Sequence, residues 1–461
     1  MNAVRRWFGT DGIRAPFGQA PLDEPTVRAL GLALGARLDH RQGARARVVL
    51  GGDTRASTPV LMRWLASALV HQGVDLCLAG MLPTPGIAWL TRDLGADAGL
   101  VVSASHNPSS DNGIKLLDGR GFKWRIEDEA ALETAMLQQL EAPPPSAQPA
   151  PPPPLGRQVI DGYLASLVAS VGASDARENG AHQAPLGQLR IALDTANGAA
   201  SPFAAKIFRR LGAQVRASAD RPDGSNINRD CGSTHPQAIA AFTRTSGADL
   251  GFAFDGDADR VLVADETGTV HDGDAMLYLL ARDLDACGQL PSHAVVATSM
   301  SNLGLEIALR REGIALVRCD VGDRAVVETL RARGLRLGGE QSGHLVDLVL
   351  STTGDGMLTA LRLAALRART AQPLSTMLRD FERLPQLIEN VRVASKPDWT
   401  RLASVERARR EVCAALGQEG RLVLRYSGTE PLARIMIEGR ERTTIEALAG
   451  HLAAAIRAAI G

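Results

Sequence analysis

Apolar and polar positions along the chain alternate between two kinds of segment. Stretches with apolar residues at helical spacing are followed by a glycine and then by a short apolar run. Residues 71–80, 210–219 and 311–320 show this order most clearly, each as a helix end, a glycine and a strand. Glycine suits a helix C-terminus because it adopts the left-handed conformation without strain. The alternation is typical of α/β units built around a mostly parallel sheet.

The pattern also repeats on a larger scale. The segment LGADAGLVVSASHN (94–107) matches SGADLGFAFDGDADR (246–260) almost position for position, and RGLRLGGEQSGH (333–344) is a looser third copy. After residue 372 the pattern changes to that of a smaller α+β domain. We therefore predict three related α/β domains with mixed, mostly parallel sheets and a C-terminal α+β domain, arranged around a central cleft.

A proline-rich segment marks the first domain boundary. Eight of the twelve residues in PPPSAQPAPPPP (143–154) are proline, which donates no backbone hydrogen bond and is excluded from helix interiors and central strands. We expect a stiff, extended connector at this place, and a role for it beyond spacing is left open. The expected domains cover residues 1–155, 156–267, 268–372 and 373–461.

Composition and charge narrow the class of protein. The 461 residues are 45% hydrophobic and 22% charged with a net charge of +0, and only 4% are aromatic, so a nucleic-acid partner is not expected. The five cysteines are scattered without the paired spacing of a zinc site or a disulfide framework. The N-terminus lacks an apolar targeting segment, and no run approaches the roughly 20 apolar residues of a membrane-spanning helix. We expect a cytoplasmic protein with no membrane partner.

Each copy of the repeat ends its last strand in a polar loop that contains glycine or proline. These loops are SASHNP (103–108), DGDADR (255–260) and GEQSGH (339–344). Ligands of parallel α/β sheets bind outside the carboxyl ends of the strands. We therefore expect the three loops to form three walls of one site.

The second loop carries three carboxylates at a spacing of two. Asp255, Asp257 and Asp259 repel one another in a tight loop unless a cation lies between them. Hard oxygen ligands of this kind suit Mg²⁺, which keeps some positions for water or a phosphate. A solvated acidic loop is the alternative, but the apolar run LGFAF leads this loop directly out of a buried strand.

The first loop offers a nucleophile, Ser105, with His106 directly behind it. A serine hydrolase is the obvious rival, but its usual G-x-S-x-G turn is absent. Neighbouring residues of a turn tend to point apart, so we expect His106 to orient groups rather than to act as the base for Ser105. A phosphoryl group on Ser105 would supply an oxygen ligand that a three-aspartate magnesium site still lacks.

Lysine is rare in this chain, at 115, 123, 206 and 396 only, which draws attention to Lys115 in NGIK. A lysine exchanges protons when its pKa is lowered, whereas an arginine does not. Lys115 is therefore the candidate for general acid/base work, the alternatives being a phosphate contact or a surface position.

Further groups suit a sugar and its phosphates. Glu340 and Ser342 in the third loop can bind hydroxyl groups or an amine. At 425–431 the sequence RYSGTEP forms a compact set of phosphate donors, namely Arg425, Ser427, Gly428 and Thr429. Near the N-terminus FGTDGIR (8–14) closes on Arg14, a second cation that can face a phosphate.

Six motifs occur in an order that resembles the α-D-phosphohexomutases: FGTDGIR, SASHNP with DNGIK, DGDADR, VGDR, GEQSGH and RYSGTEP. The form GEQSGH with VGDR is most similar to the bacterial phosphoglucosamine mutases of that family. The resemblance runs from about residue 7 to the C-terminus. It implies a heart-shaped enzyme of four domains, with the phosphoserine loop, metal loop, sugar loop and phosphate clamp on successive domains.

The resemblance also implies roles for single residues. Ser105 matches the phosphoserine nucleophile, and the other catalytic positions are Lys115, Arg14 and His106. One Mg²⁺ per chain would be held by Ser105, Asp255, Asp257 and Asp259. The implied substrate-binding residues are Glu340, Ser342, His344, Arg260, Arg425, Ser427, Gly428 and Thr429.

The implied reaction converts glucosamine 6-phosphate to glucosamine 1-phosphate for UDP-N-acetylglucosamine and the cell wall. Glucosamine 1,6-bisphosphate is the implied intermediate and activator. The partner is a small sugar phosphate, the protein is a monomer or homodimer, and Ser105 is primed by an unidentified kinase or by self-phosphorylation.

Several positions depart from the family pattern without removing a catalytic group. They are Gly52, Ala258 and Ala325, where the family shows Lys, Gly and Tyr. Alternatives to an amino-sugar mutase are a phosphomannomutase/phosphoglucomutase with the same mechanism, a silent sugar-phosphate binder, and a metal-dependent phosphatase. The intact Ser105, aspartates and Lys115 argue against a silent binder.

Overall fold

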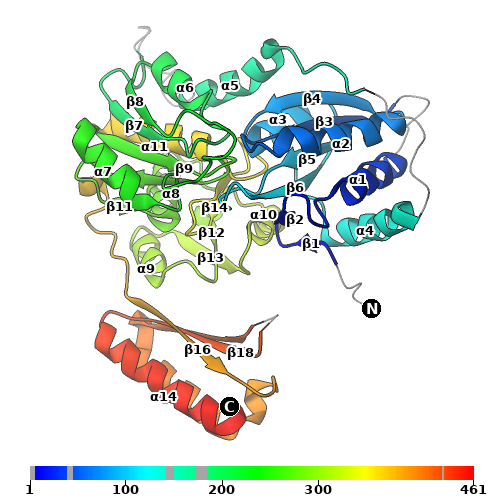
Figure 1. The fold of residues 1–461 in the computed structure, drawn as a ribbon. Coiled ribbons are helices and arrows are strands. Elements are labelled where there is room, and N and C mark those ends of the chain that lie inside the picture. Colours follow the sequence, from blue (N-terminus) through cyan, green and yellow to red (C-terminus); the bar gives the residue numbers. More distant parts are fainter. Residues whose placement is uncertain (1–5, 39–44, 142–149, 173–183, 428–429) are drawn as a thin grey trace. The chain divides into compact units, whose positions relative to one another are not determined.

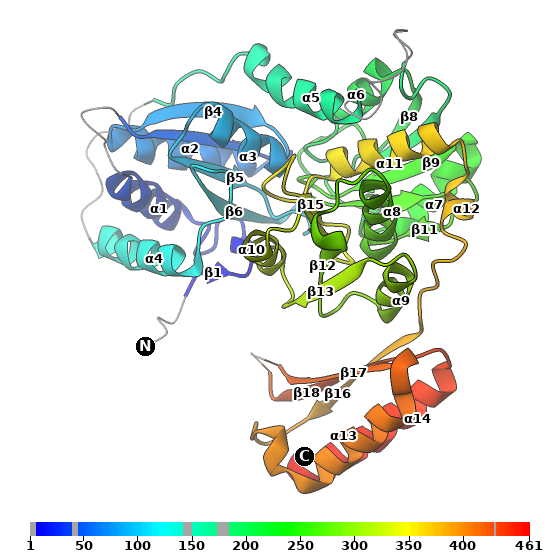
Figure 2. The ribbon, with the colours of Figure 1, turned by 180° about the vertical axis from the view of Figure 1, so that it is seen from behind.

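The computed structural model places four sheets and their helices along the chain (Figures 1 and 2). The residues that it describes are 6–38, 45–141, 150–172, 184–427 and 430–461. They form two compact units, one of residues up to 299 with 317–378, the other of 300–316 with 379–461. Within the described residues, the helices include none that is long and apolar enough to cross a membrane.

The first sheet has six strands in the order β1-β2-β6-β5-β3-β4. Its strands are β1 (Phe8–Gly9), β2 (Gly12–Pro16), β3 (Arg47–Gly52), β4 (Asp75–Met81), β5 (Ala98–Val102) and β6 (Asp111–Asp118). Its helices are α1 (Glu24–Arg37), α2 (Thr58–His71), α3 (Thr84–Asp93) and α4 (Ile126–Glu141). Strands β4, β3 and β5 are parallel, and β6 and β2 run antiparallel to their neighbours.

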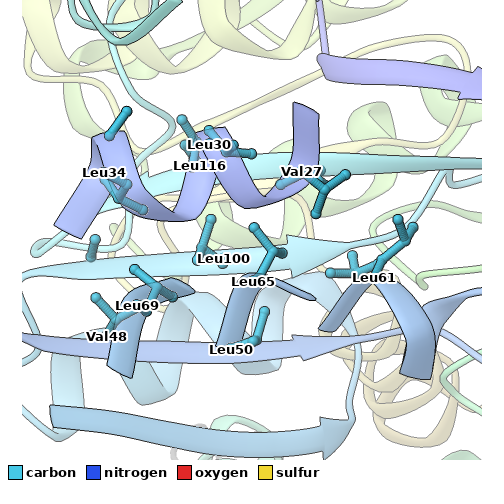
Figure 3. Packing of buried hydrophobic residues seen from close by; sticks show 14 of the residues in the cluster. Val27, Leu30, Leu34, Val48, Leu50, Leu61, Leu65, Leu69, Leu100 and Leu116 are labelled. Atoms are coloured by element: carbon cyan, nitrogen blue, oxygen red, sulfur yellow. The ribbon is translucent and has the colours of Figure 1, made fainter. Parts of the chain in front are cut away.

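Successive side chains of a strand point to opposite faces of the sheet, and the side chains on one face form the core of this domain. Val48 and Leu50 of β3, with Leu100 of β5 and Leu116 of β6, point to the same face of the sheet (Figure 3). Leucines at helical spacing on α1 and α2 cover that face, because both helices turn their apolar stripes toward it. The carboxyl ends of β3 and β5 are thereby held rigidly at one edge, where the polar loops begin.

The second and third sheets repeat this arrangement. The second has the order β11-β10-β9-β7-β8 and the third β13-β12-β14-β15. The strands are β7 (Arg190–Asp194), β8 (Gln214–Ser218), β9 (Leu250–Phe254), β10 (Val261–Ala264), β11 (Val270–His271), β12 (Ala294–Thr298), β13 (Ala315–Cys319), β14 (Leu337–Gly339) and β15 (Leu345–Asp347). The helices are α5 (Arg157–Gly172), α6 (Ala204–Arg210), α7 (Pro236–Ser246), α8 (Gly273–Ala286), α9 (Leu303–Arg311), α10 (Asp323–Arg333), α11 (Gly356–Thr370) and α12 (Leu374–Met377), with a 3-10 turn η2 (Pro291–His293).

Equivalent strands occupy equivalent places in the three sheets. Strand β5 pairs parallel with β3 and antiparallel with β6, and β9 does the same with β7 and β10. In the third sheet β14 pairs parallel with β12 and antiparallel with β15. The predicted repeat is therefore a repeat of topology, and the predicted class of three α/β domains with mixed sheets is confirmed.

The C-terminal unit carries the smaller α+β fold. Its sheet has the order β16-β18-β17 and is antiparallel throughout. Its elements are β16 (Gln386–Arg392), η3 (Trp399–Arg401), α13 (Ala403–Leu416), η4 (Gly417–Glu419), β17 (Arg421–Tyr426), β18 (Leu432–Glu438) and α14 (Arg442–Ile460). One apolar cluster, to which β16, β18, α13 and α14 contribute, forms its core.

The end of the proline-rich segment contacts the first sheet. Residues 142–149 lie outside the described part of the chain, so the predicted connector is seen only from Ala150 onward. Pro154 forms an isolated parallel bridge with Leu78 of β4. The Leu155 N–H donates to the Leu78 carbonyl at 2.7 Å, so the chain enters α5 from a fixed point on the edge of the first sheet.

Candidate active site

The carboxyl ends of β5, β9 and β14 bring the three polar loops together. Ser105, three residues beyond the end of β5, is fully buried. Its Oγ donates to Asp255 Oδ2 at 2.5 Å and lies 3.3 Å from His106 Nδ1. The expectation that Ser105 and His106 point apart is wrong. Ser105 has a φ of 52°, and this left-handed backbone turns the two side chains toward each other.

The second loop follows β9 and returns into β10. The carboxylates of Asp255, Asp257 and Asp259 are buried, and each offers an oxygen within 4.8 Å of the others. Among the described atoms, Asp257 Oδ1 and Asp259 Oδ1 are buried without a hydrogen-bond partner. Burial, followed by the negative charges of Asp259 and Asp257, raises the pKa of Asp255 well above its ordinary value. The loop therefore concentrates negative charge where water is excluded.

Ala258 stands in this loop where the family pattern has glycine. Its φ is 55°, so the position does require the left-handed backbone. An L-residue with a Cβ is strained there by about 1 kcal/mol relative to glycine. Two backbone hydrogen bonds hold this residue: the Gly356 N–H donates to the Ala258 carbonyl at 3.0 Å, and the Ala258 N–H donates to the Asp255 carbonyl at 3.1 Å.

Lys115 on β6 reaches across to the metal loop. Its Nζ lies 2.7 Å from Asp257 Oδ2, 3.1 Å from Asp259 Oδ2 and 3.4 Å from Asp11 Oδ2. Burial lowers the pKa of Lys115, but Asp11, Asp257 and Asp259 outweigh it and raise the pKa well above its ordinary value. The lowered pKa expected of a general acid/base is therefore not found, and the side chain is an ammonium ion paired with the carboxylates.

Asp11 and Lys123 extend this charge network; Lys123 stood out in the sequence only as one of four lysines, and Asp11 did not stand out. Asp11 pairs with Arg14, Lys115 and Lys123, and Lys123 also pairs with Asp323 at the start of α10. Burial opposes ionisation of Asp11, but the nearby lysines and Arg14 hold its pKa well below its ordinary value. Asp11 lies in the motif FGTDGIR and Asp323 in the motif VGDR. The motifs therefore marked both segments as functional, although they did not mark these two aspartates individually.

The third loop contributes His344, Glu340 and Ser342. His344 Nε2 accepts the Gly354 N–H at 3.0 Å, which leaves Nδ1 as the donor facing Asp259 Oδ2 at 3.8 Å. Burial lowers the pKa of His344, but its hydrogen bond and charge interaction with Asp259 raise it above the ordinary value. Glu340 accepts the Gly322 N–H at 3.0 Å, and Ser342 Oγ is buried without a partner among the described atoms.

Two arginines flank the Ser105 loop. Arg14 donates to Asn107 Oδ1 at 3.2 Å and pairs with Asp11, while Arg260 Nε lies 3.8 Å from Asp259 Oδ1. Burial and then the positive charges of Arg260 and Arg14 lower the pKa of His106. These surroundings favour the neutral ring of His106, whose nitrogen can accept a hydrogen bond or a proton.

A buried arginine supports the loop that carries Ser105. Arg55 pairs with Asp53 at 2.9 Å and donates to the carbonyls of four residues in the Ser105 loop: Ser105, Asn107, Pro108 and Asp111. Asp53 also accepts from Ser103 Oγ at 2.6 Å. Both residues lie in the sequence GGDTR, but the sequence alone did not show that Arg55 donates to the carbonyls of the Ser105 loop.

In the C-terminal unit, Arg425 lies exposed near the end of β17, and Ser427 follows it. Ser427 Oγ is 3.4 Å from Glu430 Oε2, and Lys396 Nζ donates to the Ser427 carbonyl at 2.6 Å. The other two predicted clamp residues, Gly428 and Thr429, lie outside the described residues.

Comparison with known proteins identifies the family of this chain. Models of the phosphoglucomutase/phosphomannomutase family match in order: alpha/beta/alpha domain I at residues 5–142, domain II at 161–268, domain III at 272–384 and the C-terminal domain at 389–455. The chain belongs to the phosphoglucomutase/phosphomannomutase family.

Relatives within this family carry a more specific name. A phosphoglucosamine mutase of Rhodospirillum centenum is 46% identical over 461 residues, covering 99% of this chain and 96% of that protein. One of Symbiobacterium thermophilum is 43% identical over 98% of this chain and 99% of that protein. The crystal structure of a family protein from Burkholderia thailandensis has a TM-score of 0.77 at 25% identity, covering 98% of this chain and 97% of that one. The prediction of a phosphomutase enzyme of this family is thus confirmed.

Proposed function

We propose that this protein converts glucosamine 6-phosphate to glucosamine 1-phosphate by passing a phosphoryl group between Ser105 and the sugar through a 1,6-bisphosphate. The observation that carries the proposal is the position of Ser105 Oγ, 2.5 Å from Asp255 and 3.3 Å from His106. The sugar is inferred from the near-full-length relatives named phosphoglucosamine mutase.

The metal loop fits Mg²⁺. Its donors are three carboxylates, hard ligands of the kind this ion prefers, and two of their buried oxygens lack a partner among the described atoms. Asp255, Asp257 and Asp259 would hold the ion, with an oxygen on Ser105 as a further ligand. Bound there, Mg²⁺ would neutralise charge on the transferred phosphoryl group.

The side chains around Ser105 suit phosphoryl transfer. The sugar hydroxyl attacks phosphorus, the bond from phosphorus to Ser105 Oγ breaks, and the second half-reaction reverses these events at the other end of the bisphosphate. Arg14, Arg260 and the Lys115 ammonium supply positive charge toward the transferred group, since this reaction depends mainly on positioning and electrostatics. His106 can accept the proton that the sugar hydroxyl loses and return it to Ser105 Oγ, 3.3 Å from Nδ1, as the bond from Oγ to phosphorus breaks.

The third loop and the C-terminal unit would bind the rest of the substrate. Glu340, Ser342 and His344 offer an acceptor, an unpartnered hydroxyl and a donor for the sugar. Arg425 and Ser427, with Gly428 and Thr429, would bind the phosphate that is not being transferred. Domain boundaries at 155, 267 and 372, cytoplasmic location, a monomer or homodimer, and the route by which Ser105 is primed stay predictions.

A substrate panel tests the proposal directly. The purified protein with Mg²⁺ receives the 6-phosphates of glucosamine, glucose and mannose, each with a trace of its 1,6-bisphosphate. We expect a strong preference for glucosamine 6-phosphate. A preference for glucose or mannose would reassign the chain to the phosphoglucomutase/phosphomannomutase alternative, and release of inorganic phosphate without isomerisation would make it a phosphatase.

A further inference from the structure

The backbone of Ser105 is held from both sides in a conformation that serine rarely adopts. Its φ of 52° lies in the left-handed region, and the residue is fully buried. The N–H of Ser105 donates to Ser103 Oγ at 2.9 Å. Strained backbone of this kind persists only where the surroundings over-determine it, and it gathers at functional sites. The groups that hydrogen-bond to the Ser105 carbonyl therefore help to hold this conformation.

Two side chains donate to that carbonyl, and one comes from another domain. Arg55 of the first domain donates to the Ser105 oxygen at 2.9 Å. Asn228, in the loop between β8 and α7 of the second domain, donates to it at 2.8 Å and to the Asn107 carbonyl at 3.0 Å. Both contacts use Nδ2, because only the amide nitrogen of Asn228 can donate to a carbonyl.

The backbone conformation of Asn228 and a backbone hydrogen bond fix the position of this residue. Its φ is 58°, a region in which asparagine is favoured over most residues, and its N–H donates to the Ala196 carbonyl at 2.9 Å. Gly256 of the metal loop covers the same carbonyl, since a Cβ there would lie 2.5 Å from the Ser105 oxygen and 3.0 Å from Asn228 Nδ2. Asn228 thus lies where the Ser105 loop and the metal loop meet.

We infer that Asn228 is a positioning residue for the nucleophile: by capturing the Ser105 carbonyl from the second domain, it holds Ser105 in the left-handed conformation that directs Oγ to Asp255. Asn228 does not touch the reacting oxygen. Its contribution is to keep Ser105 Oγ in place while the phosphoryl group arrives and leaves. The role of Ser105 Oγ as the reacting atom rests on the proposed function. The effect of Asn228 on the backbone conformation of Ser105 does not depend on that function.

The decisive variant is Asn228→Asp, which has nearly the same shape and tolerates a positive φ but cannot donate to the two carbonyls when ionised. Asp230→Asn is the matched control. Asp230 lies two residues further in the same loop, is exposed and has a φ of 56°. The double variant Asn228→Asp/Asp230→Asn restores the loop's net charge without restoring the donor.

Three measurements separate the outcomes. We expect Asn228→Asp and the double variant to lose at least tenfold in kcat with KM within about twofold and with a cooperative thermal transition above the assay temperature, whereas Asp230→Asn stays at the wild-type kcat. Mass spectrometry of Ser105 phosphorylation checks that the loss is not one of occupancy. A crystal structure of Asn228→Asp should show Ser105 outside the left-handed region.

The contrary results separate the inference about Asn228 from the proposed function. If the wild-type protein isomerises sugar phosphates but Asn228→Asp keeps its kcat, the inference is wrong and the proposed function stands. Rescue of kcat in the double variant would reduce the effect to loop charge, which also overturns the inference. If wild type isomerises no sugar phosphate, the proposed function fails; the crystal structure still decides the inference, because an unchanged φ at Ser105 would refute it.

Discussion

Ser105 Oγ and Asp255 Oδ2 lie 2.5 Å apart although the two residues belong to different domains. The contact joins the nucleophile loop after β5 to the metal loop after β9, two strands that occupy the same place in their sheets. The site is therefore built by duplication: equivalent strand ends carry different chemistry, and packing of the domains brings them together.

Ser105→Ala should abolish turnover and leave folding nearly intact. The substitution removes only Oγ from a buried position and leaves the backbone hydrogen bonds of Ser105 in place. We expect less than about a tenth of the wild-type kcat with a similar midpoint of thermal unfolding. A variant that retains a larger fraction of the rate would remove Ser105 from the mechanism.

Lys115→Met should make the protein depend on a divalent cation for stability as well as for activity. The lysine neutralises Asp11, Asp257 and Asp259, and its loss leaves buried carboxylates without their cation. We expect a lower Tm in the absence of metal and a larger upward shift of Tm on adding Mg²⁺ than in wild type. The exposed Lys206→Met serves as control, and equal Mg²⁺ shifts in Lys115→Met and wild type would contradict the prediction.

Arg55→Met should destabilise the fold severely. Arg55 is fully buried, pairs with Asp53 and donates to four carbonyls of the Ser105 loop, so the variant leaves a buried carboxylate without its cation and removes a donor from each of these carbonyls. Breaking a buried ion pair costs about 3–5 kcal/mol. Urea unfolding measures the loss. The exposed pair of Arg125 with Asp128 gives the control, because Arg125→Met should leave the urea midpoint unchanged.

The free energy of unfolding should fall as the pH rises from about 4 to 6, because Asp355 ionises less readily in the native state than in the unfolded chain. Burial raises the pKa of Asp355 from 3.8 to about 6, despite hydrogen bonds from Leu358 N–H and the Tyr163 hydroxyl. The native state therefore binds more protons than the unfolded chain in this window, and the free energy of unfolding decreases as the pH rises through it. A shift of this size corresponds to about 3 kcal/mol.

Asp355→Asn tests this, since asparagine carries no charge, keeps the cap by accepting the Leu358 N–H with Oδ1, and can donate from Nδ2 to the Tyr163 oxygen. Relative to wild type, the variant should gain up to about 3 kcal/mol between pH 4 and pH 7 in urea unfolding. Asp398, an exposed cap whose pKa is lowered by hydrogen bonds from Thr400, should show the opposite direction on Asp398→Asn. A pH-independent difference between Asp355→Asn and wild type would rule out the buried ionisation.

The sequence predicted the elements of this site better than the contacts between them. Each loop followed an apolar strand, so Asp255, Ser105 and Glu340 could be placed at strand ends from local pattern alone. The left-handed backbone of Ser105 depends on Arg55 and Asn228, which are 50 and 123 residues away in the chain. For the same reason the contact of His106 with Ser105 and the raised pKa of Lys115 could not be foreseen, since both follow from packing between domains.

The bridge from Pro154 and Leu155 to Leu78 changes what the edge of the first sheet offers to another strand. Strand β4 lies at the edge of its sheet, and an open edge can accept a strand from another molecule. The Leu155 N–H already occupies the Leu78 carbonyl, and the prolines before it have no N–H with which to extend a ladder. The end of the segment therefore covers the β4 edge at Leu78 without offering a new ladder to another strand, and the chain continues from there into the second domain.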